Sequence, residues 1–216
     1  MTSKAFSWST TGDDIVQASA DRVKGRTFLI TGVSKNSLGA ETAMTLARHG
    51  SPAQIILAGR FRYRIDPVIA KIKELNPDVK VFFVPLELTE PSSIRAAARQ
   101  ILSYPKFKNI DVLMNYAGIG AFIWFPCLIG WRREEWPDLQ LGANHFPDFD
   151  NKDTKTKRQL IVTGLVAALD PGLEAHSGAY LSDCQIAVPA EHARGKDRAE
   201  RLWKITEEIA AQEFPI

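Results

Sequence analysis

The chain has 216 residues, of which 45% are hydrophobic and 24% charged, and its formal net charge is +2. Such a length and composition are typical of one globular domain with a sizeable core. The small net charge argues against a nucleic-acid partner and against binding to an acidic membrane surface. The first residues are polar and resemble no secretory signal, so we expect a cytoplasmic protein with reduced thiols. The most apolar stretch, 117–131, is too short to span a bilayer, so no membrane partner is expected.

Between residues 25 and 118, short apolar runs alternate with helical patterns, which predicts strands joined by helices. The predicted strands are 27–31, 54–58, 79–84 and 110–114. Because each strand is a continuous apolar run, it should be buried on both faces, as strands of parallel sheets are. Strand–helix units of roughly 30 residues are typical of right-handed βαβ crossovers. The chain therefore predicts an α/β fold, a Rossmann-type doubly wound parallel sheet.

Three helices are predicted between these strands. The first contains apolar residues at helical spacing and stops at Gly50. The second should begin at Asp66 as its N-cap, with Pro67 in its first turn. The third begins at about Pro91, and its predicted buried face consists of Ile94, Ala97, Ala98, Ile101 and Leu102.

Beyond residue 118 the regular alternation ends, so the doubly wound sheet is expected to be shortened in its second half. Residues 119–156 show no clean period. We predict one helix at 157–169, one strand within 178–188, and a terminal amphipathic helix at about 192–212. The inward face of that last helix should carry Leu202, Ile205 and Ile209. The whole chain, 1–216, is interpreted as a single domain, with 25–118 as its dinucleotide-binding half, 119–156 irregular and 157–216 as C-terminal helices and one strand.

The turn after the first strand carries a glycine pattern, Thr31-Gly32-Val33-Ser34-Lys35-Asn36-Ser37-Leu38-Gly39. Gly32 permits a tight turn, and Gly39 permits close packing of the helix on the strand. Free N–H groups and the positive dipole end at a helix start suit a pyrophosphate. An ordinary strand–helix turn would look similar, because the middle glycine of the dinucleotide-binding pattern is absent.

The end of the second strand points to the kind of dinucleotide. An NAD-binding protein would carry Asp or Glu there to accept from the ribose 2′-OH. This chain has Gly59-Arg60 instead, and an arginine can pair with a 2′-phosphate in bidentate fashion. Lys35 in the glycine loop should lie near the same phosphate. The pattern favours NADP(H), although two solvated surface cations would give the same sequence.

These motifs resemble those of the short-chain dehydrogenase/reductase family. The likeness rests on Thr31-Gly32 with Gly39, on Gly59-Arg60, and on Asn115-Tyr116-Ala117-Gly118, which is similar to the family's Asn-Asn-Ala-Gly motif. Glu87 stands where the family places an acid that contacts adenine. The resemblance covers about residues 8–118 and 160–212 and is closer to fungal, retinol-dehydrogenase-like members, many of which belong to secondary-metabolite pathways.

The resemblance implies an NADP(H)-dependent oxidoreductase that interconverts a ketone and an alcohol on a lipophilic small molecule. It implies that a set of residues holds the cofactor: Gly32, Ser34, Lys35, Leu38, Gly39, Arg60, Glu87, Asn115, Ala117 and Gly118. No metal is expected, because the four histidines are scattered along the chain.

Most of the family's catalytic residues are missing from the sequence. Its Tyr-x-x-x-Lys pair is matched only by Tyr104 and Lys108, which precede the fourth strand and so lie at the wrong edge of the sheet. Asn144 resembles the family's catalytic asparagine, and Tyr116 is the one tyrosine expected near a nicotinamide. Two βα units, at least about 60 residues, are absent between Phe146 and Leu160.

An internal deletion of this kind leaves a second interpretation open. The chain would then be a catalytically inactive NADP-binding relative, or the product of a mis-spliced gene. The deletion would also remove most of the helices through which the family dimerises, so a homo-oligomer is possible but not by the usual route.

Overall fold

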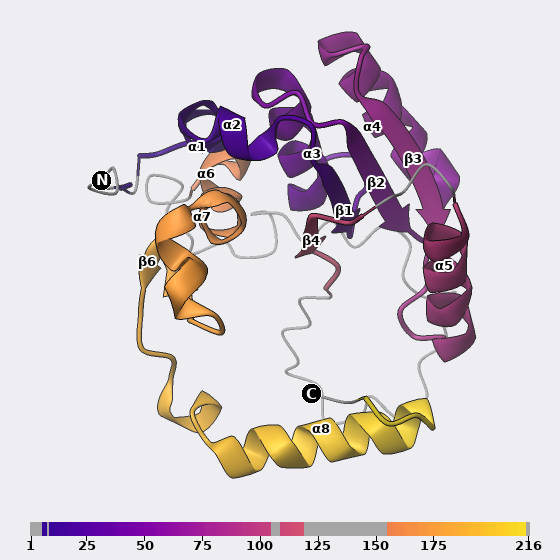
Figure 1. The fold of residues 1–216 in the computed structure, drawn as a ribbon, viewed down its shortest axis with the longest axis vertical. Coiled ribbons are helices and arrows are strands. Elements are labelled where there is room, and N and C mark those ends of the chain that lie inside the picture. The colour runs from indigo at the N-terminus through magenta and orange to yellow at the C-terminus, as the bar shows by residue number, and fades with distance from the viewer. Residues whose placement is uncertain (1–5, 8, 105–108, 119–154, 215–216) are drawn as a thin grey trace, which may run out of the picture.

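The computed structural model describes residues 6–7, 9–104, 109–118 and 155–214 (Figure 1). Its first part contains α1 (Gly12–Ala18), α2 (Ala20–Val23), β1 (Thr27–Thr31), α3 (Leu38–His49), β2 (Gln54–Gly59), α4 (Arg62–Leu75), β3 (Lys80–Pro85), α5 (Pro91–Ser103) and β4 (Val112–Asn115). Its second part contains α6 (Lys157–Leu160), α7 (Val162–Leu169), η3 (Pro171–His176), β5 (Leu181–Ser182), β6 (Gln185–Ile186), η4 (Glu191–Ala193) and α8 (Lys196–Ala210).

The central sheet has four parallel strands in the order β3-β2-β1-β4. The chain therefore moves outward from β1 to β3 and then returns to place β4 on the other side of β1. Thr31 at the end of β1 is opposite Ala58 in β2 and Asn115 in β4. In open α/β sheets, a reversal of strand order marks the ligand-binding crevice outside the carboxyl ends of the strands, here those of β1 and β4.

Helices cover both faces of the sheet, which confirms the predicted α/β doubly wound fold. Strand residues such as Phe28 and Leu57 join one large core with side chains from α1, α3, α4 and α7. Ile56 and Val84 point to the other face, where α5 covers them. The inner strands β1 and β2 are buried on both faces, as their continuous apolar runs predicted, whereas the outer strands β3 and β4 are only partly buried.

The start of α4 corrects a prediction. Asp66 is not the N-cap; the helix begins at Arg62, and Pro67 lies inside it. Starting five residues earlier, with Phe61 as the N-cap, places Ile65, only 1% exposed, inside the helix and in the same buried stripe as Val68. Pro67 is tolerated because it removes a single hydrogen bond close to the helix start.

The buried face of α5 is narrower than predicted. Ala97 and Ile101 are buried, whereas Ile94, Ala98 and Leu102 are exposed. The reason is that α5 covers only the β2–β3 side of its face of the sheet. Leu113 in β4, on that same face, is 57% exposed.

Two helices at the beginning of the described chain were not predicted. α1 starts with a capping box in which the Thr11 hydroxyl accepts from the Asp14 N–H and the Asp14 carboxylate accepts from the Thr11 N–H. Its buried residues Ile15 and Val16 pack in the main core together with α7. The Thr-x-x-Asp pattern was the available sequence signal.

The second half differs from the sequence prediction in three ways. The helix expected at 157–169 is divided into α6 and α7, which meet at Ile161. The tail forms two short strands, β5 and β6, which pair with each other in antiparallel fashion and not with the central sheet. The face of α8 expected to point inward is exposed, because α8 lies apart from the sheet (Figure 1). None of the described helices is long and apolar enough to cross a membrane.

Candidate functional site

The glycine loop lies at the crevice between the ends of β1 and β4. Gly32 has a φ of +69°, and a Cβ on it would lie 2.5 Å from the backbone N of Ala117. Gly39 packs against the carbonyl oxygens of Thr31 and Gly32, at 3.1 Å from the position of its missing Cβ. The loop therefore needs glycine at both positions. Gly32 allows the close approach of the residues after β4, and Gly39 allows α3 to pack on the end of β1.

Asn36 explains how the loop turns without a middle glycine. Its φ is +70°, in the left-handed region that asparagine tolerates better than other non-glycine residues. Ser37 then caps α3, and its hydroxyl oxygen accepts from the N–H groups of Ser34 (3.0 Å) and Ala40 (3.1 Å). The loop thus has a defined shape, with the positive end of α3 at its mouth.

A small hydrogen-bond brace joins β1 to the residues that follow β4. The Thr31 hydroxyl donates to the Asn115 side-chain oxygen at 3.3 Å and accepts from the Ala117 N–H at 3.3 Å. Thr31 is buried, so the brace is shielded from water. It brings Asn115 and Ala117 beside the glycine loop, as expected for residues predicted to bind the same cofactor.

The basic residues gather on the neighbouring segment, 60–64. The Lys35 N–H donates to the Arg64 carbonyl oxygen at 3.1 Å, which ties the glycine loop to the first turn of α4. Arg60 directly follows β2, its guanidinium lies 5.6 Å from the centre of the Phe61 ring, and it is exposed, as is Lys35. The tertiary structure therefore brings the two predicted phosphate ligands to one edge of the sheet.

Two further arginines on this segment were not considered from the sequence alone. Arg62 forms an ion pair with Asp66 at 3.3 Å and stacks over Phe83 at 5.7 Å. Arg64 contacts the Phe61 and Tyr63 rings, each at 5.7 Å. Their alternation with two aromatic residues in Arg60–Arg64 was the signal that could have drawn attention to them.

Glu87 lies after β3, at the same sheet edge as Gly59, because Gly59 is opposite Pro85. Its carboxylate accepts from the Thr89 hydroxyl at 2.9 Å and from the Thr89 N–H at 3.2 Å. Its own N–H donates to the Ser93 hydroxyl oxygen. In this structure Glu87 holds the turn between β3 and α5.

Tyr116 points into the interior of the protein. Its hydroxyl lies near the Thr42 hydroxyl of α3 and near Gly164 of α7. Burial raises the pKa of Tyr116 above its ordinary value of 10.0, and the neighbouring Thr42 hydroxyl offsets only part of that rise. This interior placement gives no support for proton transfer by Tyr116.

The remaining candidates fall elsewhere. Asn144 and Lys108 lie outside the described residues. Tyr104 ends α5 and packs edge-on against Phe82 in β3, 5.4 Å between ring centres, away from the glycine loop. Ser34 and Leu38 lie within the loop and at the start of α3, and Gly118 follows the brace residues.

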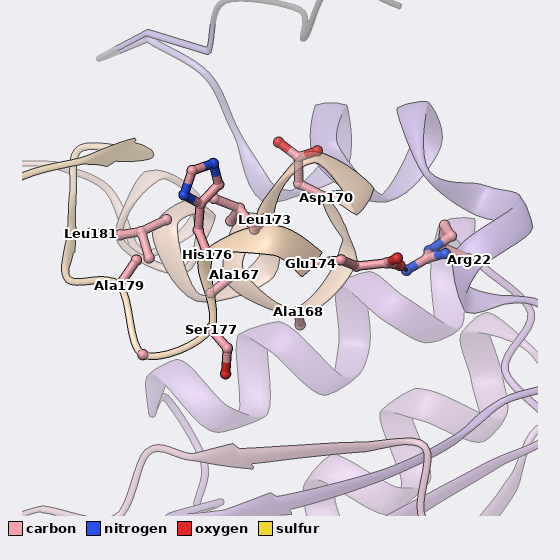
Figure 2. Close-up of a pocket in the computed structure, with 11 residues that line it drawn as sticks. Arg22, Ala167, Ala168, Asp170, Leu173, Glu174, His176, Ser177, Ala179 and Leu181 are labelled. Atoms are coloured by element: carbon pink, nitrogen blue, oxygen red, sulfur yellow. Dashed lines mark hydrogen bonds and ion pairs between the residues drawn. The ribbon is translucent and has the colours of Figure 1, made fainter.

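A separate cavity of about 390 Å³ lies between α2 and η3 (Figure 2). Figure 2 shows Arg22 and Glu174 pointing toward each other, and their ion pair is 2.6 Å long. No residue of the glycine loop and no residue of segment 60–64 lines this cavity. It is therefore distinct from the candidate cofactor site.

Two relatives and one solved structure illustrate what the chain is similar to. The oxidoreductase fscI of Fusarium equiseti is 32% identical over 114 residues, which cover 53% of this chain and 43% of that protein. Human retinol dehydrogenase 11 is 28% identical over 134 residues, which cover 62% of this chain and 39% of that protein. A crystal structure of an NADH-dependent reductase complexed with NAD is 28% identical, with a TM-score of 0.36 over 44% of this chain and 37% of that one.

The chain thus spans about two fifths of the length of these relatives. Residues 26–136 include the glycine loop, the arginine segment and the brace between β1 and β4. The model of the short chain dehydrogenase family matches residues 26–136, which is more than half of the chain. This protein therefore belongs to the short-chain dehydrogenase family.

Proposed function

We propose that this chain binds NADP(H) at the carboxyl edge of its sheet. The observation that carries the proposal is the Lys35 N–H bond to the Arg64 carbonyl, which holds a lysine of the phosphate-binding loop against the arginine segment that follows β2. Together these elements make one positively charged end to the crevice between β1 and β4. A dinucleotide with an extra phosphate on its adenosine ribose suits that end better than one with a free 2′-OH.

The loop itself fits the pyrophosphate. Gly32 lets the backbone turn closely past Ala117, Asn36 takes the left-handed conformation, and the start of α3 points its N–H groups toward the crevice. The proposed cofactor contacts remain those named from the sequence: Gly32, Ser34, Lys35, Leu38, Gly39, Arg60, Glu87, Asn115, Ala117 and Gly118. Glu87 and Asn115 would serve through the turn and the brace that they hold.

By family membership, the proposed reaction is the interconversion of a ketone and an alcohol on a lipophilic small molecule. A bound nicotinamide supplies the hydride in such a reaction. The described residues orient the cofactor through the loop, the arginine segment and the Thr31 brace. The fungal relative is named an oxidoreductase, which supports the proposed reaction class by analogy. The proposal places that reaction in fungal secondary-metabolite biosynthesis.

A second candidate is an NADP(H)-binding protein without turnover, as a mis-spliced or decayed copy would be. The burial of the Tyr116 hydroxyl favours it, because Tyr116 is the tyrosine that the sequence predicts near a nicotinamide. Reads of the transcript that restore a Tyr-x-x-x-Lys segment between Phe146 and Leu160 would favour the enzyme.

Fluorescence titration of the whole chain with NADPH and NADH tests the proposal. The wild type should prefer NADPH, and Arg60→Ala should weaken NADPH binding by about 1.5–3 kcal/mol while leaving NADH binding unchanged. Arg62→Ala is the matched control, because Arg62 is already paired with Asp66. No binding of either cofactor by a folded wild type, or a preference for NADH, would overturn the proposal.

Turnover separates the two candidates once binding is established. NADPH oxidation with generic ketones supports the enzyme, and its loss in Tyr116→Phe would make Tyr116 the proton donor despite its burial. Tight NADPH binding with no turnover on any ketone supports the non-catalytic protein.

A further inference from the structure

The last helix, α8, presents an apolar stripe that nothing in the described chain covers. Leu202, Ile205 and Ile209 are 66%, 40% and 74% exposed, and α8 contains no buried residue. Their spacing of three and four residues places them on one side of the helix. In Figure 1 α8 lies along one border of the molecule, apart from the sheet. An exposed apolar stripe of this kind marks a candidate interaction surface.

The neighbouring side of α8 is already occupied by the chain's own tail. The Trp203 indole N–H donates to the Glu207 carboxylate at 3.1 Å, and the same carboxylate oxygen accepts from the Phe214 N–H at 2.7 Å. The Trp203 and Phe214 rings pack edge-on at 6.2 Å. The tail thus folds back on one side of α8 and leaves the Leu202–Ile209 stripe uncovered.

The charges along α8 are distributed unfavourably for the helix dipole, with basic residues in excess near its N-terminus and acidic residues near its C-terminus. Residues 196–204 contain four basic side chains and two acidic ones, a net charge of +2, whereas residues 205–210 contain two acidic side chains and no basic one, a net charge of −2. A helix alone is stabilised by the opposite order, with acids first and bases last. Stability of the isolated helix therefore does not account for this pattern.

A second α8 running in the opposite direction makes the same pattern favourable. The positive half of each helix would then face the negative half of the other, and the two dipoles would also be opposed. Arg201 and Glu208 are seven residues apart and so border the same side of the stripe, and both are exposed. In an antiparallel pair, this flank of one helix lies against the same flank of the other helix. Arg201 therefore faces Glu208 of the partner subunit, and the two-fold symmetry repeats the pair. A parallel pair would bring the two positive halves together.

We propose that α8 is a self-association surface that pairs antiparallel with α8 of a second copy of this chain. The interface would be isologous, with a core of Leu202, Ile205 and Ile209 flanked by two Arg201–Glu208 pairs. Because α8 has only 15 residues, the dimer should be a weak one that forms with rising protein concentration. The inference does not depend on cofactor binding.

Sedimentation equilibrium of the whole chain over a range of concentrations tests this surface. The wild type should show a monomer–dimer equilibrium, and Arg201→Glu or Glu208→Arg alone should weaken the dimer about tenfold or more. The double variant Arg201→Glu/Glu208→Arg should restore dimerisation, because the two pairs are then reversed. Lys204→Glu is the matched control: it changes the net charge as Arg201→Glu does but lies off the flank, so it should leave most of the dimer.

Circular dichroism melts show whether each variant remains folded, and Ile205→Asp should give a folded monomer. A folded wild type that stays monomeric at every concentration would overturn the proposal. So would a dimer that survives Ile205→Asp, or a double variant as weak as the two single variants.

Discussion

The phenolic oxygen of Tyr116 occupies the space that a side chain on Gly164 would need. A Cβ on Gly164 would lie 2.6 Å from that oxygen and 3.4 Å from the ring carbon that bears it. Tyr116 follows β4, and Gly164 lies in α7, so the contact joins the sheet to the helices of the second half of the chain. The absence of a side chain at residue 164 is what allows α7 to pack over the end of β4.

Gly164→Ala should therefore destabilise the wild type by about 1–3 kcal/mol, because the new methyl group overpacks a buried site. In a Tyr116→Phe background the nearest contact disappears, and the same change should be neutral or stabilising by up to about 1 kcal/mol through helix propensity. Urea unfolding of the four proteins in the double-mutant cycle measures the coupling. Additive effects would show that the two residues do not touch.

The buried Tyr116 hydroxyl also predicts a pH dependence of stability. Its pKa is raised above 10.0 in the folded protein, so the folded state keeps the proton at a pH where the unfolded chain releases it. This stabilisation is complete below about pH 10 and is lost as the pH rises toward the folded pKa, at about 1.4 kcal/mol for each unit of pKa rise. Unfolding free energies of the wild type should fall more steeply above pH 10 than those of Tyr116→Phe. Parallel curves would contradict the prediction.

Gly32→Ala should be far more damaging than Gly25→Ala, although both glycines have a positive φ, +69° and +74°. A Cβ on Gly32 would meet backbone atoms of Tyr116 and Ala117 at 2.5 Å, whereas nothing lies within 4 Å of one on Gly25. We expect a cost of about 1–2 kcal/mol at Gly25 from the backbone conformation alone. At Gly32 the clash adds to that cost, and NADPH binding should be lost. Thermal melts and cofactor titration of the two variants measure the difference; equal losses would exclude the clash.

Asn36 should accept glycine but not a β-branched residue. Asn36→Gly keeps the left-handed conformation without steric cost, so folding and NADPH affinity should be unchanged or better. Asn36→Val should lose about 1–2 kcal/mol and distort the loop before Ser37. The melting temperature and NADPH affinity of both variants provide the measurement, and a Val variant equal to wild type would show that the left-handed turn is not needed.

The ion pairs of Asp13 should contribute to the docking of α1. Its carboxylate lies 3.0 Å from Arg48 and 3.2 Å from His49 of α3, and 3.3 Å from Arg158 of α6. Asp13→Asn should destabilise the protein by about 1–2 kcal/mol, since three helices lose a shared anion in a partly shielded position. The loss should shrink in high salt, which denaturant melts at two ionic strengths can show. Asp66→Asn, at an exposed pair with Arg62, should cost little by comparison.

Much of the sheet could be predicted because its strands are local patterns. Each strand is an apolar run bounded by residues that stop it, and burial on both faces makes that run continuous whatever packs against it. The glycine loop was predictable for the same reason, since Gly32 and Gly39 stand where neighbouring backbone atoms leave no room for a side chain. The capping role of Ser37 and the left-handed turn at Asn36 are equally local and were readable in principle.

Tertiary structure alone decided the features that depend on a partner surface. Asp66-Pro67 is a strong helix-start pattern, yet α4 begins earlier because burial of Ile65 outweighs a cap. The sequence predicted that the apolar faces of α5 and α8 point toward the core. An amphipathic pattern shows that one face of a helix is apolar, but it does not show which surface covers that face. Tyr116 appeared to belong to the crevice by its place after β4, and packing turned its hydroxyl toward Thr42 and Gly164 instead. Local physics sets where strands and turns form, and long-range packing sets which side chains remain available for chemistry.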